Sequence, residues 1–442
     1  MHRLSISMLL AGASLLAAIP AAAQSAATPE AAPADTGAIG EIIVTAQRRA
    51  ERLQDVPVSV MAVTGTALTA SGVTNPQELA TITPGLTVVF SRNTATPYLR
   101  GVGTQNAAPG DEGSVSNYID GVYIAALSGT LMTFNNVQRV EVLKGPQGTL
   151  FGRNTTGGLV QVITAEPDGQ THVKGTVEYA SYDTPMANVY ATTGLTSTLS
   201  ADIAAYYSDQ NNGWGKQIAT GKDINYATDK AIRSKLVWRP NDDVKVTLAG
   251  DWSRRDSDYG TIRQIYPGTR GFGGFVPTGD IHDSSSGLAS FGRADQYGGS
   301  LTVNYALGFA DLTSITAIRH YFADYNFDQD STPLEVVNGH FTNWADTYQQ
   351  EFLLNGKTGR LSYTTGVFMF YEKDKLSRPL TSKILAQFNS DLDSKQDTWS
   401  LAGYLQGTYA ITDTTNLTLG GRFTHSSRDI TGYFTGLPGG LR

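Results

Sequence analysis

Apolar and polar side chains alternate along most of the chain after about residue 170. In Asp243–Trp252 every second residue is apolar or small, and residues Asn416–Phe423 repeat the pattern. A period of two is typical of a β-strand with one apolar and one polar face. Such strands fit either a membrane barrel, whose apolar face contacts lipid, or a soluble sandwich, whose apolar face forms the core.

The lengths of the connections distinguish these two architectures. The pattern predicts about eleven strands with uncertain boundaries, and after the first strand the connections alternate between short and long. A sandwich has no reason to alternate in this way, whereas an outer-membrane barrel has short periplasmic turns and long outer loops. We therefore expect an antiparallel membrane β-barrel with the strands His172–Tyr182, Met186–Leu195, Ser200–Asp209, Thr228–Arg239, Asp243–Arg254, Asp295–Ala306, Phe309–Asp324, Trp344–Leu354, Arg360–Lys373, Thr398–Ala410 and Asn416–Arg428.

The region before these strands has a different pattern of residues. Short β-branched runs predict strands at Glu41–Ala46, Ser116–Ile124 and Leu159–Thr164. Helices are expected at Ala67–Ala70 and at Pro76–Ile82, the second ending before a Pro-Gly pair. Many glycines separate these segments, which is typical of tight turns. The sequence therefore predicts a small mixed α/β domain in front of the barrel.

Composition excludes several classes of protein. The chain has no Cys, so it holds no disulfide framework, thiolate metal site or cysteine nucleophile. A net charge of −7 argues against a nucleic-acid binder, which usually presents a basic face. No pair among the six His has metal-ligand spacing, and no hydrolase or phosphate-loop motif occurs. We therefore expect no enzyme, no cofactor and no metal site.

The first residues have the pattern of an export signal. Met1–Arg3 is basic, Leu4–Ile19 is almost wholly apolar or small, and Ala21–Ala23 precedes Gln24. This order matches a signal peptide, residues 1–23, with cleavage after the third alanine. The Ala- and Pro-rich stretch over residues 24–40 has no periodicity and predicts a flexible periplasmic tether.

Several sequence motifs then follow one another along the chain. They read EIIVTAQRR at Glu41–Arg49, LRGVGT at Leu99–Thr104, YIDGVYI at Tyr118–Ile124, and NVQRVEVLKGPQGTLFGRNTTGGLVQVIT at Asn136–Thr164. In this order and spacing the set resembles the plug domain of TonB-dependent outer-membrane receptors. The resemblance implies a plug domain over residues 47–167, a partial transmembrane barrel over residues 168–442, and a location in the outer membrane of a Gram-negative bacterium.

The resemblance also implies site residues. It identifies a TonB box in Glu41, Ile42, Ile43, Val44, Thr45 and Ala46, a β-prone segment suited to strand addition. The alternative is that these residues are simply the first strand of the plug. Basic plug positions Arg100 and Lys144 are expected to meet a barrel glutamate, best matched by Glu351, although that acid is equally consistent with an ordinary lumen-facing carboxylate; the family usually has Arg at position 144. The plug motif comprises Gly101, Asp120, Gly121, Arg139, Glu141, Gly145, Gly148, Gly152, Gly157 and Gly158.

The implied function is active uptake of a scarce solute, with a ferric siderophore as the default ligand and cobalamin, glycans, aromatics and other metals left open. The implied partners are TonB with ExbB and ExbD, outer-membrane lipid and the barrel-assembly machinery. Aromatic residues in or beside the outer loops are expected either to contact the ligand or to form an interfacial girdle; they are Trp214, Trp252, Tyr259, Tyr266, Phe272 and Phe275.

Three alternatives remain at this point. A passive porin would need neither plug nor TonB box. A receptor that also signals to an anti-sigma factor would need a further folded domain, for which residues 24–40 offer no room. A plugged transporter has about 22 strands, and bacterial single-chain barrels have an even number. With about eleven strands and a non-aromatic end, GLPGGLR, we expect an incomplete barrel, an N-terminal fragment of a longer receptor, with a non-functional fragment as the third alternative.

Overall fold

The computed structural model describes residues 42–91, 94–104, 112–125, 136–258, 267–384 and 389–436. The predicted signal peptide, the tether and Glu41 lie outside these residues. Within them, no helix is long and apolar enough to cross a membrane.

A five-stranded mixed sheet forms the first part of the described chain. Its strands, in spatial order, are β3 (Val60–Thr64), β8 (Val137–Lys144), β9 (Gly158–Thr164), β6 (Val115–Ile119) and β7 (Val122–Ile124). Strands β6 and β9 are parallel, and the other neighbours are antiparallel. Helices α1 (Gly65–Ala70) and α2 (Pro76–Ile82) accompany this sheet, and the latter has the predicted bounds. Leu79, Val140 and Val142 are fully buried in the core, so the mixed α/β prediction is confirmed.

Short elements complete this region. The side chain of Thr64 caps α1 by accepting a hydrogen bond from the backbone N–H of Ala67 at 3.3 Å. The remaining elements are β1 (Ile43–Val44), β2 (Glu51–Arg52), the 3₁₀ turn η1 (Leu53–Asp55), β4 (Leu86–Ser91) and β5 (Thr94–Leu99). Strands β1 and β2 pair with each other, as do β4 and β5.

The predicted strand Ser116–Ile124 is wrong in one respect, because the structure folds it into the β6–β7 hairpin. Its two turn residues, Asp120 and Gly121, have φ of +48° and +84°. A two-residue turn of this kind needs positive φ at both positions, which Asp-Gly adopts readily. The signal for the turn was present in the sequence within an otherwise continuous β-prone run.

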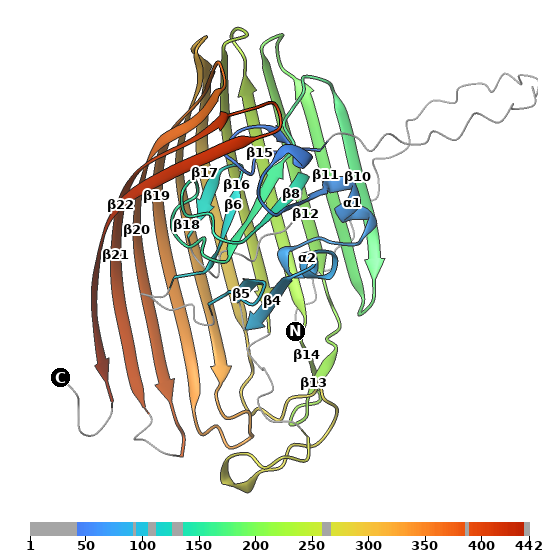
Figure 1. Ribbon diagram of the computed structural model, residues 1–442. Helices are drawn as coiled ribbons and strands as arrows, with labels where there is room; N and C mark the ends of the chain where they lie inside the picture. Colours follow the sequence, from blue (N-terminus) through green and yellow to red (C-terminus); the bar gives the residue numbers. More distant parts are fainter. Residues whose placement is uncertain are drawn as a thin grey trace, which may run out of the picture. The chain divides into compact units, whose positions relative to one another are not determined.

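An eleven-stranded antiparallel sheet follows, with its strands side by side in sequence order (Figure 1). The strands are β10 (His172–Ala180), β11 (Thr184–Gly194), β12 (Leu199–Asp209), β15 (Ala227–Trp238), β16 (Val244–Ser257), β17 (Gly292–Ala306), β18 (Ala310–Asp328), β19 (Asn338–Thr358), β20 (Leu361–Thr381), β21 (Ser390–Ala410) and β22 (Asn416–Thr435). A small hairpin, β13 (Gly215–Gln217) and β14 (Lys222–Ile224), lies in the connection between β12 and β15. The predicted number of strands is confirmed, and β10 and β22 are the two edges of this sheet.

The two faces of this sheet differ as the alternation predicted. On β15, Ile232 and Leu236 are exposed, whereas Arg233 and Lys235 are buried. Apolar side chains therefore point outward and polar ones inward, which is the arrangement of a membrane barrel and the reverse of a sandwich.

Two of the long connections are shorter than expected. The predicted loop over residues 325–343 is shortened because β18 continues to Asp328 and β19 begins at Asn338. The predicted loop over residues 374–397 is mostly strand, because β20 continues to Thr381 and β21 begins at Ser390. Strands that extend beyond the lipid are polar on both faces, so their composition resembles that of a loop.

Candidate functional site

The predicted TonB box lies on the five-stranded plug sheet. Ile42 to Ala46 contain β1, in which Val44 is fully buried while Ile43 is 42% exposed. The backbone N–H of Leu53 donates to the carbonyl of Ile42 at 2.9 Å, which ties this segment to the residues after β2. These positions fit both a coupling segment and a first plug strand, so the TonB box stays a prediction.

Glu141 on β8 binds this segment through hydrogen bonds to its carboxylate. Its carboxylate is fully buried and accepts hydrogen bonds from the backbone N–H of Thr45 at 3.0 Å and from the Arg139 guanidinium at 2.7 Å. The amide of Gln161 on β9 donates to the Thr45 hydroxyl at 2.7 Å. Arg139 and Glu141 of the predicted plug motif thus converge on the predicted TonB box.

Arg48 joins the same segment to the barrel wall. Its guanidinium lies 2.9 Å from the Glu351 carboxylate on β19 and stacks over the rings of Phe151 and Tyr118, at 4.6 and 5.4 Å from their centroids. Burial alone would lower the pKa of Arg48, but the adjacent Glu351 carboxylate outweighs it and raises that pKa above its ordinary value. The Tyr404 hydroxyl on β21 also donates to Glu351, at 2.7 Å.

The structure pairs Glu351 with Arg48 and not with the predicted Arg100 or Lys144. The guanidinium of Arg100 donates to the Ser59 hydroxyl at 3.0 Å, and the backbone N–H of Lys144 donates to the Ser59 carbonyl at 2.8 Å. Both residues therefore meet at the start of β3. Sequence reasoning missed Arg48 because its partner is 303 residues away and no local pattern marks the contact.

Two further contacts join the plug sheet to the wall. The side-chain amide of Gln349 on β19 accepts a hydrogen bond from the backbone N–H of Tyr123 at 3.0 Å and donates one to its carbonyl at 2.5 Å. This side chain therefore satisfies both backbone groups of Tyr123 on β7. On β15, the Lys235 ammonium lies 3.0 Å from Asp120, whose carboxylate also accepts from the backbone N–H of Thr164 at 2.9 Å.

The predicted motif glycines lie in turns and at close contacts. At Gly158, φ is +131° and a Cβ would lie 2.1 Å from the Leu143 carbonyl oxygen, so only glycine fits. Gly152, with φ of +80°, faces the Arg422 guanidinium of β22. Positive φ also occurs at Gly101, Gly121 and Gly145, whereas Gly148 and Gly157 have no such requirement.

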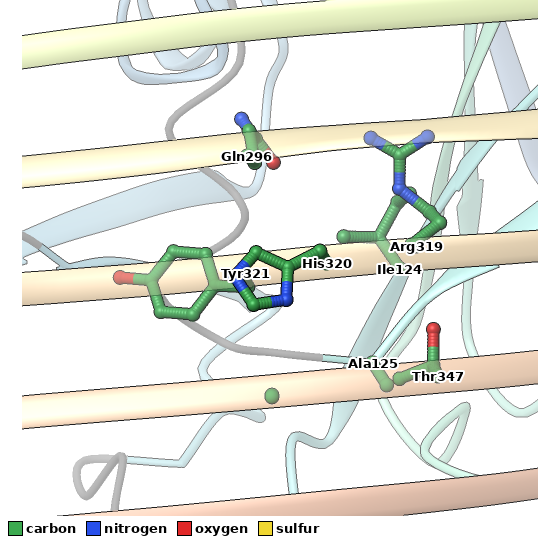
Figure 2. Close-up of a pocket in the computed structure, with 8 residues that line it drawn as sticks. Ile124, Ala125, Gln296, Arg319, His320, Tyr321 and Thr347 are labelled. Carbon is green, nitrogen blue, oxygen red and sulfur yellow. The ribbon is translucent and has the colours of Figure 1, made fainter.

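A small cavity separates the end of the plug sheet from the inner wall. Ile124 and Ala125 line it from the plug side, and Gln296, Arg319 and Thr347 line it from strands β17, β18 and β19 (Figure 2). Arg319 forms a two-point ion pair with Asp251, at 2.8 and 2.7 Å. No group of three or more ionisable side chains in the described part of the chain could hold a metal ion.

The predicted aromatic residues occupy different places. Trp252 faces outward on β16, whereas Trp214 packs edge-on against His282 at 5.1 Å in the long connections. Phe272 lies in the 3₁₀ turn η3 (Phe272–Gly274), and Phe275 follows it. Tyr259 and Tyr266 lie outside the described residues.

Comparisons with known proteins agree with this architecture. The TonB-dependent Receptor Plug Domain model matches residues 52–159. A pesticin receptor of Yersinia enterocolitica is 26% identical over 411 residues, which cover 90% of this chain and 58% of that protein. A pesticin receptor of Yersinia pestis is 35% identical over 130 residues, which cover 29% of this chain and 19% of the relative. The chain thus spans little more than half the length of the Yersinia enterocolitica receptor.

Solved structures show the same fold. The crystal structure of the ferric yersiniabactin uptake receptor of Yersinia pestis matches with a TM-score of 0.73 at 20% identity, over 86% of this chain and 58% of that one. The ferripyoverdine receptor of the Pseudomonas aeruginosa outer membrane, bound to ferripyoverdine, matches with a TM-score of 0.69 at 18% identity, over 88% and 54%. The chain is therefore a Gram-negative outer-membrane protein that carries the plug domain of a TonB-dependent receptor in front of a sheet with the fold of that family's barrel.

Proposed function

We propose that the protein takes part in the energised uptake of a scarce solute across the outer membrane, and that the solute is a ferric siderophore. The relatives include a ferric yersiniabactin uptake receptor and a ferripyoverdine receptor, which supports this ligand class. The outer membrane has no ATP, so the energy must come through a periplasmic contact. We assign that contact to TonB, driven by ExbB and ExbD, with Glu41–Ala46 as the segment that TonB holds.

One observation carries this proposal. The segment that would be pulled is bonded to the plug through Thr45 and Glu141, and Arg48, two residues after it, pairs with Glu351 on the wall. Removing one partner from a buried ion pair costs about 3–5 kcal/mol, because the other charge is left uncompensated. A force on this segment therefore acts first on the bonds that seat the plug.

Strand addition describes how the partner would hold the segment. The partly exposed Ile43 lies in a two-residue strand, and an added strand would bond to the same backbone groups that now pair with β2. Proline has no backbone N–H and cannot continue such a ladder.

The test is uptake of a radiolabelled ferric siderophore by cells in which a full-length receptor containing this sequence is the only receptor for that ligand. We expect Ile43→Pro to abolish uptake and to leave ligand binding at the cell surface unchanged. The matched control is Thr66→Pro, at an exposed plug position outside the candidate box, in the first turn of α1, where proline is tolerated.

Three outcomes separate the alternatives. Normal uptake by Ile43→Pro would remove the TonB-box assignment. Uptake that persists without TonB would support a passive porin. Binding and TonB-dependent uptake of cobalamin or a glycan, but of no ferric complex, would keep the energised transport and replace the ligand class.

A further inference from the structure

The plug and the wall leave a cleft open on the side of the short barrel turns. Arg49, Ala50 and Glu51 line it from the plug, and the wall contributes the β17–β18 turn together with Asn355 and Lys357 of β19. The volume of this cleft is about 670 Å³. Short turns face the periplasm in outer-membrane barrels, so the cleft opens toward the periplasm.

The small cavity at the end of the plug sheet lies on the same sector of the wall. Gln296, Arg319 and Thr347 line it from β17, β18 and β19, and Ile124 and Ala125 line it from the plug (Figure 2). The cleft is lined by the same three strands, nearer to their short turns. The cavity and the cleft are therefore the two ends of one stretch of the inner wall.

A short length of β19 separates the two spaces. Thr347 lines the cavity and Asn355 lines the cleft, and along an extended strand these residues are about 27 Å apart. Successive side chains of a strand point to opposite faces, so Gln349, Glu351 and Leu353 face inward between them. All three are buried. The plug therefore closes the stretch between the cavity and the cleft by covering these side chains.

The segment around the predicted TonB box covers two of the three. Arg48 pairs with Glu351 at 2.9 Å, and Val44 belongs to the same buried cluster as Leu353. The plug residues that line the cleft follow directly in the chain. Withdrawal of this segment toward the periplasm therefore uncovers Glu351 and extends the cleft along β19 as far as Gln349.

The short strand β7 covers the remainder. Tyr123 occupies the side-chain amide of Gln349 with both of its backbone groups, and Val122 packs with Ile315 and Ala317 of β18. Strand β7 pairs with β6 through three residues and is the last strand of the plug sheet. Few backbone hydrogen bonds hold such a strand, so it can move from the wall without unfolding the sheet behind it.

We propose that the solute crosses along the inner face of β17, β18 and β19, and that Arg48 and β7 are two gates in series on this path. A pull on the TonB box withdraws Arg48 first. Because Arg48 also stacks over the ring of Tyr118 in β6, its departure loosens the β6–β7 hairpin. Once uncovered, β19 presents the polar groups of Gln349, Glu351 and Asn355 to water and solute. This path rests on the proposed uptake function and adds the place in the barrel where the solute crosses.

The test measures the leak of stachyose, an uncharged tetrasaccharide, into liposomes that contain a full-length receptor with this sequence. The variant Q349A/E351A removes the two wall side chains that hold the gates. Loss of one partner destabilises a buried ion pair strongly, so we expect liposome swelling to become about a hundredfold faster. Heat-modifiable gel mobility shows that the barrel of each variant has folded and closed.

A matched control changes the other face of the same strand. Gln350 and Phe352 alternate with the two gate partners, and Phe352 is exposed on the outward face of β19. The variant Q350A/F352A should therefore swell at the wild-type rate.

An introduced thiol shows where the leak runs. The chain has no native Cys, and Ala317 on β18 and Ala204 on β12 are both buried in the wall. In the Q349A/E351A background, we expect a bulky maleimide to react with Ala317→Cys and to stop the leak. Ala204→Cys should stay unreactive, and its leak should continue.

The opposite results identify which part of the proposal is wrong. No leak from Q349A/E351A in a closed barrel would overturn the two gates. Reaction at Ala204→Cys, an unreactive Ala317→Cys, or a leak that continues after Ala317→Cys has reacted would overturn the assignment of the path to this sector. The assay uses neither a siderophore nor TonB, so normal uptake by Ile43→Pro would remove the TonB-box assignment and leave the measured path in place.

Discussion

Two of the contacts that hold the plug against the barrel wall differ in physical kind. On the β19–β21 side, the contact is buried and combines the Arg48–Glu351 ion pair with the bidentate Gln349 amide. On the β12–β16 side, it is more open: Lys235 meets a partly exposed Asp120, and Glu166 pairs with Arg239 and Lys245 near solvent.

This difference indicates which contact contributes most of the free energy that holds the plug in the barrel. Breaking a buried pair strands a charge and costs several kcal/mol, whereas exposed pairs typically contribute about 0–1 kcal/mol. Arg48, which forms the ion pair of the strong contact, lies two residues after the predicted TonB box. We infer that the plug loosens first on the β12–β16 side and is released only when the Arg48 contact opens.

The largest effect is expected from Glu351→Ala. It leaves the Arg48 guanidinium buried without its counterion, at about 3–5 kcal/mol. Because the chain has no native Cys, a thiol introduced by Ala46→Cys at a fully buried position reports local opening. Its labelling rate should rise a hundredfold or more. Asp397→Ala, which removes an outward-facing acid, is the control and should leave the rate unchanged; equal rates in both variants would contradict the ranking of the two contacts.

A smaller effect on the same side is expected from Gln349→Leu. This change leaves the backbone N–H and carbonyl of Tyr123 without partners in a buried place, at about 2 kcal/mol. Gln350→Leu is a matched control on the outward side of the same strand. Hydrogen exchange at Tyr123 should become about thirtyfold faster in Gln349→Leu only, and protection that survives the change would show that β7 does not depend on the wall.

The other side is tested by Lys235→Met. The substitution keeps the length of the side chain and removes the ion pair with Asp120, which retains its bonds from Thr164. We expect a loss of about 1 kcal/mol, because Asp120, the charge left behind, is partly exposed to water and keeps its bonds from Thr164. Ser116→Cys, a nearly isosteric change at a buried plug position, supplies the reporter thiol. Its labelling should increase about fivefold, and a hundredfold increase would make the two sides equivalent.

The sequence predicts the strands of the barrel and the turn of the plug hairpin, but not the contacts between plug and barrel. A period of two identifies each barrel strand locally, and the alternating sequences at Asp243–Trp252 and Asn416–Phe423 coincide with β16 and β22. The plug hairpin at Asp120-Gly121 was also readable, since Asp-Gly is a strong turn signal.

The residues that pair across the plug–wall contact could not be predicted from local sequence patterns. Glu351 could be selected because the strand that holds it was predicted, yet nothing local distinguishes Arg48 from Arg49 or Arg100. Arg48 has a positive φ of +62°, and that conformation has no signature in the preceding residues. Long-range contacts between a plug and a barrel depend on how the two surfaces fit. The partner of a given residue therefore cannot be predicted from that residue and its sequence neighbours.

The smallest effect is expected from Arg239→Ala. Arg239 pairs with Glu166, which keeps a second partner in Lys245 at 2.9 Å, and all three side chains are well exposed. Water and salt screen such pairs, so the loss should be below about 1 kcal/mol and should vanish in 1 M salt. The measurement is labelling of the Ser116→Cys reporter at low and high salt, with Lys216→Ala, an exposed ion-paired residue of the β13–β14 hairpin, as control. A loss as large as that of Glu351→Ala, or one that salt does not reduce, would place the seating energy on both sides of the plug and remove the expected order of release.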